Sequence, residues 1–371
     1  MKNLQKLVRN GVLSINAWPT GKPIEEIQAD LGLESLALMA TNENPLGPSP
    51  KAVEAMKAEI HKVNRYPQGP CTYLKRKVAA RLDVGEDMII FGNGADNCLR
   101  IIGYAFLNSG DEVIVAYPSF PVYGIVARTM GAVPVEVPLK DHVHDLRAMA
   151  EKIGPLTKLV FLCNPNNPTG SIVRKRELNT FVEALPDHVV LILDEAYFEF
   201  VDDEQYSNAL DYIREGRNVV ALRTFSKLYG IAGLRIGYTL ASPELTGVLE
   251  RVREPFPVSR VAEAAALAAV DDDEFKSRVL ANNEESKRFL CKSFDRLGLS
   301  YAKTHTNFMF VDLKVDAKEA AQALLERGYL IRPGTLWKHP TFARITFGTM
   351  EENRGFVAAL TKVLGKYSCG R

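Results

Sequence analysis

The sequence predicts an α/β protein with a large three-layer α/β/α domain, built on a mostly parallel sheet, and a smaller α+β domain. The first observation is a series of short apolar runs separated by helical spacers, at residues 88–91, 112–116, 133–137, 159–163, 189–193, 219–222 and 235–240. Runs without polar alternation are typical of strands buried on both faces, as in a parallel sheet between helices. The second observation is an alternating pattern at residues 307–313 and 343–347. It predicts strands of a separate sheet with one solvent-facing side.

The chain of 371 residues is long enough to divide into two domains. In the opening segment we expect irregular structure with a short helix at residues 24–33, and then a helix at residues 50–62. A mainly helical stretch at residues 259–297 leads the chain out of the larger sheet. The expected domains are a large one at residues 47–258 and a discontinuous small one at residues 1–46 and 259–371.

Composition and charge restrict the partners of the protein. Hydrophobic residues make up 46% and charged residues 25% of the chain, as in an ordinary globular protein, and the net charge is +1. This balance predicts no basic surface for nucleic acid or an anionic membrane. No segment has the length of a membrane span or the apolar core of a signal peptide. We expect a cytoplasmic protein whose partners are small molecules and a second copy of itself.

Neither disulfide nor metal chemistry is expected. The five cysteines contain no C-x-x-C pair, and an odd, scattered number argues against a disulfide framework and fits a reducing compartment. His142 and His144 have a spacing that could hold a metal ion in a strand. No further cluster of histidine or cysteine completes such a site, so we predict no metal.

The segment at residues 223–235 carries the strongest indication of function. Its sequence is Arg-Thr-Phe-Ser-Lys-Leu-Tyr-Gly-Ile-Ala-Gly-Leu-Arg, and it follows an apolar run. Lys227 is flanked by the hydroxyls of Thr224 and Ser226, on a turn of small residues that leads to Arg235. An amine in these surroundings is suited to a Schiff base beside a bound phosphate. Because a lone loop lysine is more often a solvated surface charge, the interpretation depends on the other motifs.

Two further motifs, Asn-Pro-Asn-Asn-Pro-Thr-Gly and Asp-Glu-Ala-Tyr, each follow an apolar run directly. Open parallel sheets bind ligands at the carboxyl ends of their strands. Four side chains of these motifs are expected there: Asn167, Asp194, Tyr197 and Lys227. A buried Asp194 needs a cationic or donor partner, and a protonated pyridine nitrogen supplies one. Taken singly, Asp194 could instead be a helix cap and Asn167 a turn residue.

A glycine motif, Gly92-Asn-Gly-Ala-Asp96, follows the first predicted strand and opens a helical pattern. Backbone N–H groups at such a helix start favour a phosphate. Most Gly-x-Gly sequences are only tight turns, and the third glycine of a dinucleotide-binding fingerprint is missing here. Combined with Thr224, Ser226 and Arg235, the motif predicts a phosphate site.

In their order along the chain, these motifs resemble those of the fold-type I aminotransferases that use pyridoxal phosphate. More narrowly, they resemble those of the histidinol-phosphate aminotransferase family. Further landmarks of that family are Asn42-Glu-Asn-Pro-Leu-Gly-Pro-Ser-Pro50, Arg65-Tyr-Pro67 and Arg344-Ile-Thr-Phe-Gly348. The resemblance extends from about Lys22 to Leu364. Seven motifs in one order are specific for the fold and the cofactor, and less specific for the substrate.

The resemblance implies a role for each motif residue. Lys227 would carry the cofactor, Asp194 would keep its ring nitrogen protonated, and Tyr197 would donate to its phenolic oxygen. These three are the predicted catalytic residues. The predicted cofactor-binding residues are Ala95, Asp96, Phe120, Asn167, Asp194, Tyr197, Thr224, Ser226, Lys227, Arg235 and Tyr66.

Two aromatic residues in this set have particular roles in the family. Phe120 would stack on the cofactor ring, where many relatives carry tyrosine; burial in the core is its ordinary alternative. Tyr66 would reach the site of the neighbouring subunit and contact the cofactor phosphate. The resemblance therefore implies a homodimer with two shared active sites.

The implied reaction moves an amino group between L-histidinol phosphate and 2-oxoglutarate, giving imidazole acetol phosphate and L-glutamate in histidine biosynthesis. Arg344 would pair with a substrate carboxylate through a two-pronged contact, and Arg332 with the distal phosphate. Trp18 and Asn44 complete the predicted substrate-binding residues.

One departure concerns the substrate. The family often has Pro-Tyr before Pro-Gly-Lys-Pro, whereas this chain has Ala17-Trp18 before Pro19-Thr-Gly-Lys-Pro23. An indole can donate one hydrogen bond, but the pocket becomes larger and more apolar. An aminotransferase for phenylalanine or tyrosine is therefore the main alternative. A decarboxylase of a phosphorylated amino acid and a non-catalytic effector-binding domain are the others.

Overall fold

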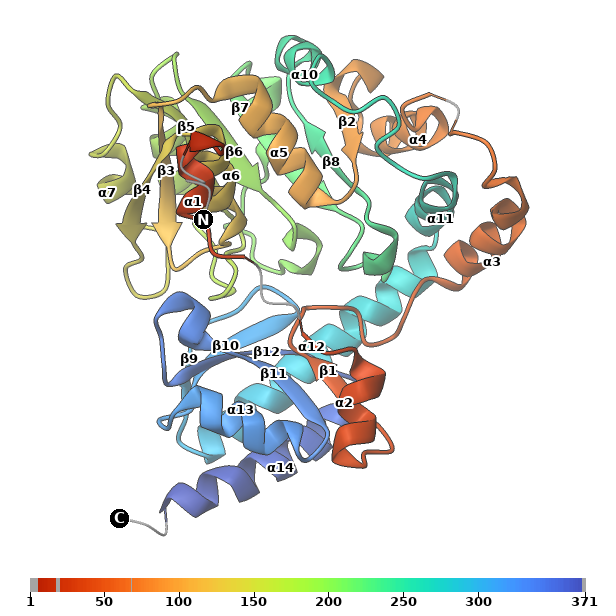
Figure 1. The fold of residues 1–371 in the computed structure, drawn as a ribbon, viewed down its shortest axis with the longest axis vertical. Helices are drawn as coiled ribbons and strands as arrows, with labels where there is room; N and C mark the ends of the chain where they lie inside the picture. The colour runs from red at the N-terminus through yellow and green to blue at the C-terminus, as the bar shows by residue number, and fades with distance from the viewer. Residues whose placement is uncertain (1–5, 18–20, 68, 369–371) are drawn as a thin grey trace.

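The computed structural model describes residues 6–17, 21–67 and 69–368, which form two sheets with helices around them (Figure 1). The larger sheet has the strand order β2-β8-β7-β6-β5-β3-β4. β8 is antiparallel to both of its neighbours, and the other pairs are parallel. The strands are β2 (Ile89–Gly92), β3 (Glu112–Tyr117), β4 (Val133–Pro138), β5 (Thr157–Cys163), β6 (Val190–Asp194), β7 (Val219–Thr224) and β8 (Gly237–Leu240). All seven predicted strands are confirmed, with ends that differ by a few residues.

Helices cover both faces of this sheet, which confirms the predicted three layers. Along β6, Leu191 and Leu193 pack in one apolar core, and Val190 and Ile192 pack in the other. A strand buried on both faces has no polar positions to alternate with, which explains its continuous apolar run. The helices of the first face are α3 (Pro50–Glu59), α4 (Thr72–Leu82), α7 (Leu146–Ala150), α8 (Lys175–Glu183), α9 (Ala209–Arg214) and α11 (Arg260–Val270). Those of the second are α5 (Ala95–Phe106), α6 (Val122–Met130) and α10 (Pro243–Glu250).

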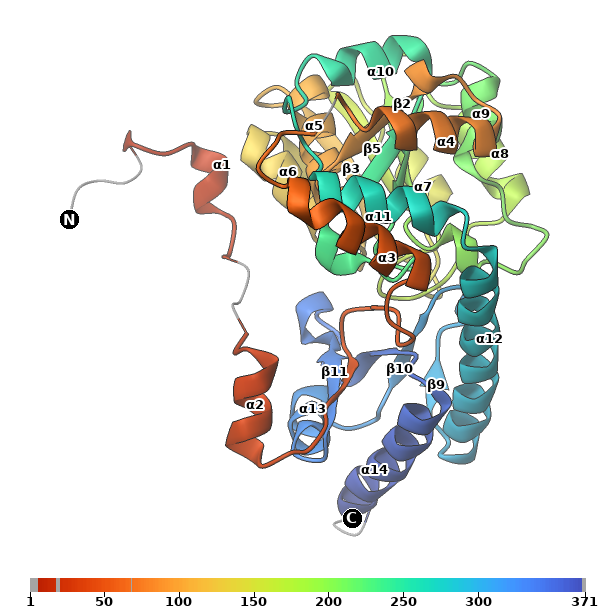
Figure 2. The same ribbon diagram turned by 90° about the vertical axis from the view of Figure 1, so that its right-hand side faces the viewer.

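The second sheet has the order β1-β11-β12-β10-β9, with β1 parallel to β11 and the other pairs antiparallel. Its strands are β1 (Ala37–Met39), β9 (Ser300–Tyr301), β10 (Phe308–Asp312), β11 (Tyr329–Pro333) and β12 (Phe342–Thr346). Helices α12 (Asp273–Arg296), α13 (Ala317–Leu325) and α14 (Met350–Ser368) lie beside it (Figure 2). β1 was not predicted, because three residues are too few for a periodic pattern.

The prediction that one side of this sheet faces solvent is wrong. In β10, Met309 and Val311 pack in the apolar core shared with the helices. Phe308 and Phe310 point the other way and are also buried, Phe308 against Tyr197 of the large domain. The second face therefore lies against the large domain rather than water, and the two domains enclose space between them.

The connection between the sheets is helical, as predicted for residues 259–297. Ser259 caps α11 by accepting a hydrogen bond from Ala262 N, and Asp272 caps α12 by accepting one from Phe275 N. Asp272 also accepts a hydrogen bond of 2.6 Å from the hydroxyl of Ser49, which precedes α3. These contacts fix the start of the long helix that runs from one sheet to the other (Figure 2).

Near the N-terminus, α1 (Asn10–Leu13) lies against α6. A Cβ on Gly11 would lie 1.8 Å from the carbonyl oxygen of Arg128, so only glycine fits this contact. The predicted helix at residues 24–33 is confirmed as α2 (Ile24–Leu31). Short 3-10 helices of the described chain lie at Ile60–Lys62, Glu86–Met88, Phe198–Phe200, Ala232–Leu234 and Gly334–Trp337. Among the described residues, no helix combines the length and apolar character needed to span a membrane.

Candidate active site

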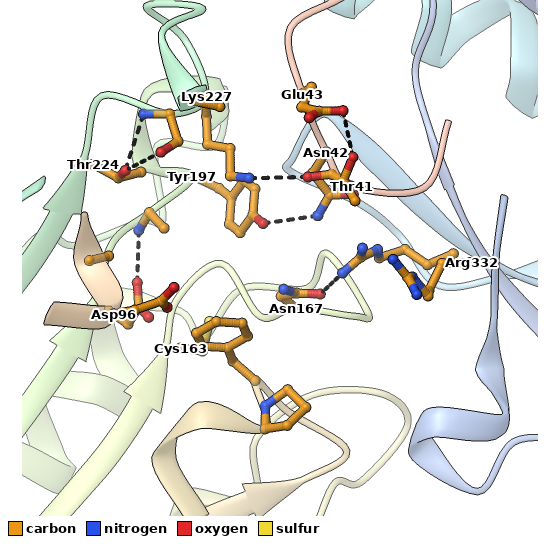
Figure 3. Close-up of a pocket in the computed structure, with 18 of the residues that line it drawn as sticks. Thr41, Asn42, Glu43, Asp96, Cys163, Asn167, Tyr197, Thr224, Lys227 and Arg332 are labelled. Carbon is orange, nitrogen blue, oxygen red and sulfur yellow. Dashed lines mark hydrogen bonds between the residues drawn. The ribbon is translucent and has the colours of Figure 1, made fainter. Parts of the chain in front are cut away.

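A cavity of about 370 Å³ lies where the carboxyl ends of β5, β6 and β7 face the second sheet (Figure 3). This is the edge at which open parallel sheets bind ligands. Twelve of the residues predicted to form the site line it: Ala95, Asp96, Phe120, Asn167, Asp194, Tyr197, Thr224, Ser226, Lys227, Arg235, Arg332 and Arg344. They come from both sheets and the loops beside them.

Lys227 lies on the loop after β7, next to the ring of Tyr197 (Figure 3). Its Nζ lies 5.6 Å from the centre of that ring and donates a hydrogen bond of 3.3 Å to the carbonyl oxygen of Thr41. Burial and the nearby Arg344 lower the pKa of Lys227 to about 8. In a substantial fraction of molecules the Lys227 amine is therefore neutral, and so nucleophilic, at physiological pH.

Asp194 is buried at the end of β6. Its carboxylate accepts hydrogen bonds of 2.6 Å from the hydroxyl of Tyr123 and 3.0 Å from Ala196 N. Burial raises the pKa of Asp194 to about 6, and the two hydrogen bonds act in the opposite direction. No cation of the described chain pairs with this carboxylate, so a cationic ligand in the cavity would complete it.

The opposite part of the cavity is built for an anion. Helix α5 begins there, and its first N–H groups have no carbonyl of the helix to bind. Gly94 has φ +79°, and a Cβ there would lie 2.5 Å from Nη2 of Arg235. The hydroxyls of Thr224 and Ser226 lie beside them, 3.0 Å apart. This cradle of glycine, hydroxyls and a guanidinium fits a phosphate group.

Two arginines face the cavity from the second sheet. Arg332 of β11 and Arg344 of β12 are directly opposite each other in the strand register. Arg344 donates to Asn167 Oδ1 at 2.5 Å and to the carbonyl oxygen of Ala40 at 2.6 Å, while its Nε has no partner. Within the described residues neither arginine forms an ion pair, and burial lowers the pKa of both. Two like charges side by side favour an anionic ligand between them.

Two predicted residues that the structure describes do not line this cavity. Tyr66 is 76% exposed and stacks on Phe256, with ring centres 4.6 Å apart. Asn44 donates its amide to the carbonyl oxygen of Leu228 instead. Trp18 lies outside the described residues.

Other residues of the site were not predicted from the sequence. The cavity is also lined by Thr41, Asn42, Glu43, Cys163 and Trp337. Asn42 begins the motif that contains Asn44, and of these two asparagines Asn42 lines the cavity. Tyr123 lies three positions after Phe120 and contacts it edge to ring. Its place in the aromatic segment at residues 117–123, three positions after Phe120, was the one signal for Tyr123.

The fold places the amine of Lys227 and the carboxylate of Asp194 in one cavity, at the carboxyl end of a mostly parallel sheet. The model of the family "aminotransferase class I and II" matches residues 34–360. The chain is 46% identical over 357 residues to the histidinol-phosphate aminotransferase of Moorella thermoacetica, covering 96% of this chain and 92% of that protein. It is 43% identical to that of Caldicellulosiruptor saccharolyticus, covering 96% and 100%.

A solved structure gives the same result. The histidinol-phosphate aminotransferase of Sinorhizobium meliloti in complex with pyridoxal-5'-phosphate superposes with a TM-score of 0.88 at 29% identity, covering 97% of this chain and 98% of that one. This chain therefore belongs to the class I and II aminotransferase family. The predicted family and fold class are confirmed.

Proposed function

We propose that the protein transfers an amino group between L-histidinol phosphate and 2-oxoglutarate, forming imidazole acetol phosphate and L-glutamate in histidine biosynthesis. The cofactor is pyridoxal 5'-phosphate. The observation that carries the proposal is the pair of guanidinium groups of Arg332 and Arg344, which face the cavity and have no carboxylate partner in the part of the chain that the structure describes. The names of the related proteins support the same substrate.

The residues around the cavity fit the cofactor. When bound, it supplies an electron sink that stabilises negative charge at the substrate Cα. Its phosphate suits the start of α5 with Thr224, Ser226 and Arg235. Asp194 suits its ring nitrogen, because an opposite charge at a few ångströms raises the pKa of such a nitrogen by roughly 1–3 units.

The remaining contacts would orient the ring. Tyr197 and Asn167 suit its phenolic oxygen, since both line the same cavity as Lys227. The Oδ1 of Asn167 is occupied by Arg344, so its Nδ2 is the group that remains to donate. Phe120 would stack on one face of the ring, supported by its edge contact with Tyr123.

Lys227 would bind the cofactor and then carry the proton of the reaction. With a pKa of about 8, its amine would be able to accept a proton from the substrate Cα and to give it back. Its side chain is held between the Tyr197 ring and Thr41, so the amine stays at the reacting atoms.

Arg332 and Arg344 would select the substrates of both half-reactions. Histidinol phosphate carries a phosphate dianion, and 2-oxoglutarate carries two carboxylates, so each substrate brings two negative charges. Phenylalanine and tyrosine bring one carboxylate. The two guanidinium groups are better satisfied by a substrate with two negative charges than by one with a single carboxylate. Each guanidinium group needs an acceptor once a ligand excludes water from the cavity.

We expect Arg332→Ala to lower kcat/KM for histidinol phosphate about 10- to 100-fold, since one charge-assisted contact contributes roughly 1.5–3 kcal/mol. The value for phenylalanine should change little. Steady-state kinetics with 2-oxoglutarate as acceptor test this. Arg327→Ala is the matched control, because that guanidinium binds the carbonyl of Ala323 on α13 instead. Equal losses for the two substrates would remove Arg332 from the phosphate role.

The Tyr123–Asp194 hydrogen bond predicts a pH dependence. Asp194 must be ionised to pair with a cationic nitrogen, so the affinity of the apoprotein for the cofactor should fall as the pH drops below about 6. Because the hydroxyl of Tyr123 lowers the pKa of Asp194, Tyr123→Phe should move this fall to higher pH, by about one unit.

Fluorescence titration of the apoprotein with pyridoxal phosphate at several pH values measures this shift. Tyr212→Phe is the matched control, since Tyr212 is also buried and donates to Asn179 at 2.6 Å, away from the cavity. Coinciding pH profiles for wild type and Tyr123→Phe would contradict the prediction.

We also propose a cytoplasmic homodimer with the two-domain division at residues 47–258 and at residues 1–46 with 259–371. The two sheets support the division. The exposed Tyr66 and Phe256 support the dimer, because large apolar side chains at a surface favour a partner. In that dimer Tyr66 would reach the cofactor phosphate of the other subunit.

An aminotransferase for phenylalanine or tyrosine remains the second candidate. The aromatic side chain of Trp337 at the cavity wall favours it, because this ring could contact an apolar substrate. Comparison of kcat/KM for histidinol phosphate, phenylalanine and tyrosine decides between the two. A higher value for either amino acid would overturn histidinol phosphate as the main substrate.

A further inference from the structure

We propose that Asn42 is a positioning residue that directs the hydroxyl proton of Tyr197 into the cavity, toward the phenolic oxygen of the cofactor. The inference rests on the proposed function, because it concerns the contact that Tyr197 would make there. Asn42 lies in the loop between β1 and α3, at the cavity wall (Figure 3).

The second sheet holds Asn42 in place with three hydrogen bonds. Its backbone N–H donates to Thr346 Oγ1 at 3.0 Å, and its Oδ1 accepts from the same hydroxyl at 3.0 Å. Its carbonyl oxygen accepts from Nδ2 of Asn307, also at 3.0 Å. The residue is 1% exposed and has φ +57°, a conformation that asparagine tolerates better than most residues. Asn42 is therefore fixed in position and orientation.

The hydrogen bonds also determine which end of the amide faces Tyr197. Thr346 Oγ1 has a single proton, which it donates to Oδ1 of Asn42. The Nδ2 of Asn42 then faces the hydroxyl oxygen of Tyr197 and donates to it at 2.9 Å. The reversed amide would place an NH₂ group against the hydroxyl proton of Thr346 and leave that proton without an acceptor. The arrangement with Nδ2 toward Tyr197 satisfies every group.

A hydroxyl that accepts from Asn42 must direct its own proton elsewhere. The ring of Tyr197 is held by an edge contact with Phe308, with centres 5.1 Å apart, and by Lys227. Burial raises the pKa of Tyr197, so its hydroxyl keeps this proton at neutral pH. The cavity is the side on which an acceptor can bind, and the phenolic oxygen of the cofactor is that acceptor.

The same strand connects this device to substrate binding. Thr346, which orients Asn42, lies two positions after Arg344 on β12. Side chains two apart on a strand share a face. A substrate anion bound by Arg344 would therefore contact the same strand, β12, whose Thr346 holds Asn42, the donor to Tyr197.

Asn42→Asp tests the proposal, because it keeps the shape and converts the donor to an acceptor. The hydroxyl of Tyr197 would then donate its hydrogen bond to the new carboxylate and no longer to the phenolic oxygen of the cofactor. A donor at that oxygen stabilises its negative charge, so its loss raises the pKa at which the visible absorption band of the bound cofactor changes. We expect a rise of about one pH unit or more in a spectrophotometric titration.

Two comparisons isolate the effect. Asn283→Asp, at a buried amide that donates to the carbonyl of Thr306, should leave the titration unchanged. In a Tyr197→Phe background the shift caused by Asn42→Asp should be about one unit smaller, because the new charge alone remains. Thr346→Val, which removes the group that orients the amide, should raise the same pKa by a smaller amount.

Equal shifts in the two backgrounds would overturn the role of Asn42, as would a Thr346→Val titration identical to wild type. The Thr346 variant gives this answer even where Asn42→Asp does not fold. A wild-type protein that forms no visible band with pyridoxal phosphate would instead refute the proposed function, and this inference with it.

Discussion

Replacing Asp194 by asparagine is expected to lower kcat about 10²–10³-fold, which is the usual cost of removing one preorganised electrostatic contact. The amide keeps the volume, but it has one oxygen where the carboxylate has two, so it can keep the hydrogen bond from Tyr123 or the one from Ala196 N in place, not both. The main loss is the negative charge that would hold the cofactor nitrogen in its protonated form. The effect should therefore appear in kcat at saturating cofactor and not only in cofactor affinity.

Turnover of histidinol phosphate and 2-oxoglutarate measures this loss, with saturation by the cofactor checked from its absorbance. Asp295→Asn is the matched control, since Asp295 also accepts from a tyrosine, Tyr301, at 2.8 Å but lies on α12 outside the cavity lining. It should retain wild-type kcat. A kcat for Asp194→Asn within threefold of wild type would contradict the electronic role of this carboxylate.

Lys227→Ala is expected to have the largest effect, a loss of kcat of about 10⁴-fold or more, because it would remove the proposed attachment point and the proposed proton carrier together. Binding of pyridoxal phosphate should weaken but persist, since the anion cradle around Arg235 and the carboxylate of Asp194 are untouched. Single-turnover kinetics and equilibrium dialysis measure the two effects separately.

Lys287→Ala provides the comparison. Lys287 is also a partly buried lysine, with 17% of its side chain exposed, but it pairs with Asp202 and Glu284. Its replacement should leave kcat per folded molecule unchanged. Substantial turnover by Lys227→Ala would show that another amine performs the chemistry.

The sequence predicted the large sheet well, because its strands are buried on both faces and read as uninterrupted apolar runs. Asp194 and Lys227 could be placed for the same reason: each follows such a run, and parallel strands bring their carboxyl ends together. At these residues the local sequence pattern is enough to predict the position in the fold.

Other features depend on contacts between distant segments and were not predictable. β1 is too short for a pattern, and its pairing with β11 joins residues almost three hundred positions apart. The outer face of β10 was expected to face solvent, because alternation cannot distinguish water from another domain. Asn42 is held at the cavity by hydrogen bonds to Thr346 and Asn307. Both residues are distant from Asn42 in the sequence, so the pattern around Asn42 does not predict these contacts.

The central claim is that Lys227 is the amine that holds the cofactor. Incubating the protein with pyridoxal phosphate, reducing it with borohydride and mapping the peptides by mass spectrometry tests this directly. We predict one stable pyridoxyl label, on the peptide that contains Lys227. A label on a different lysine, with Lys227 unmodified, would contradict the account.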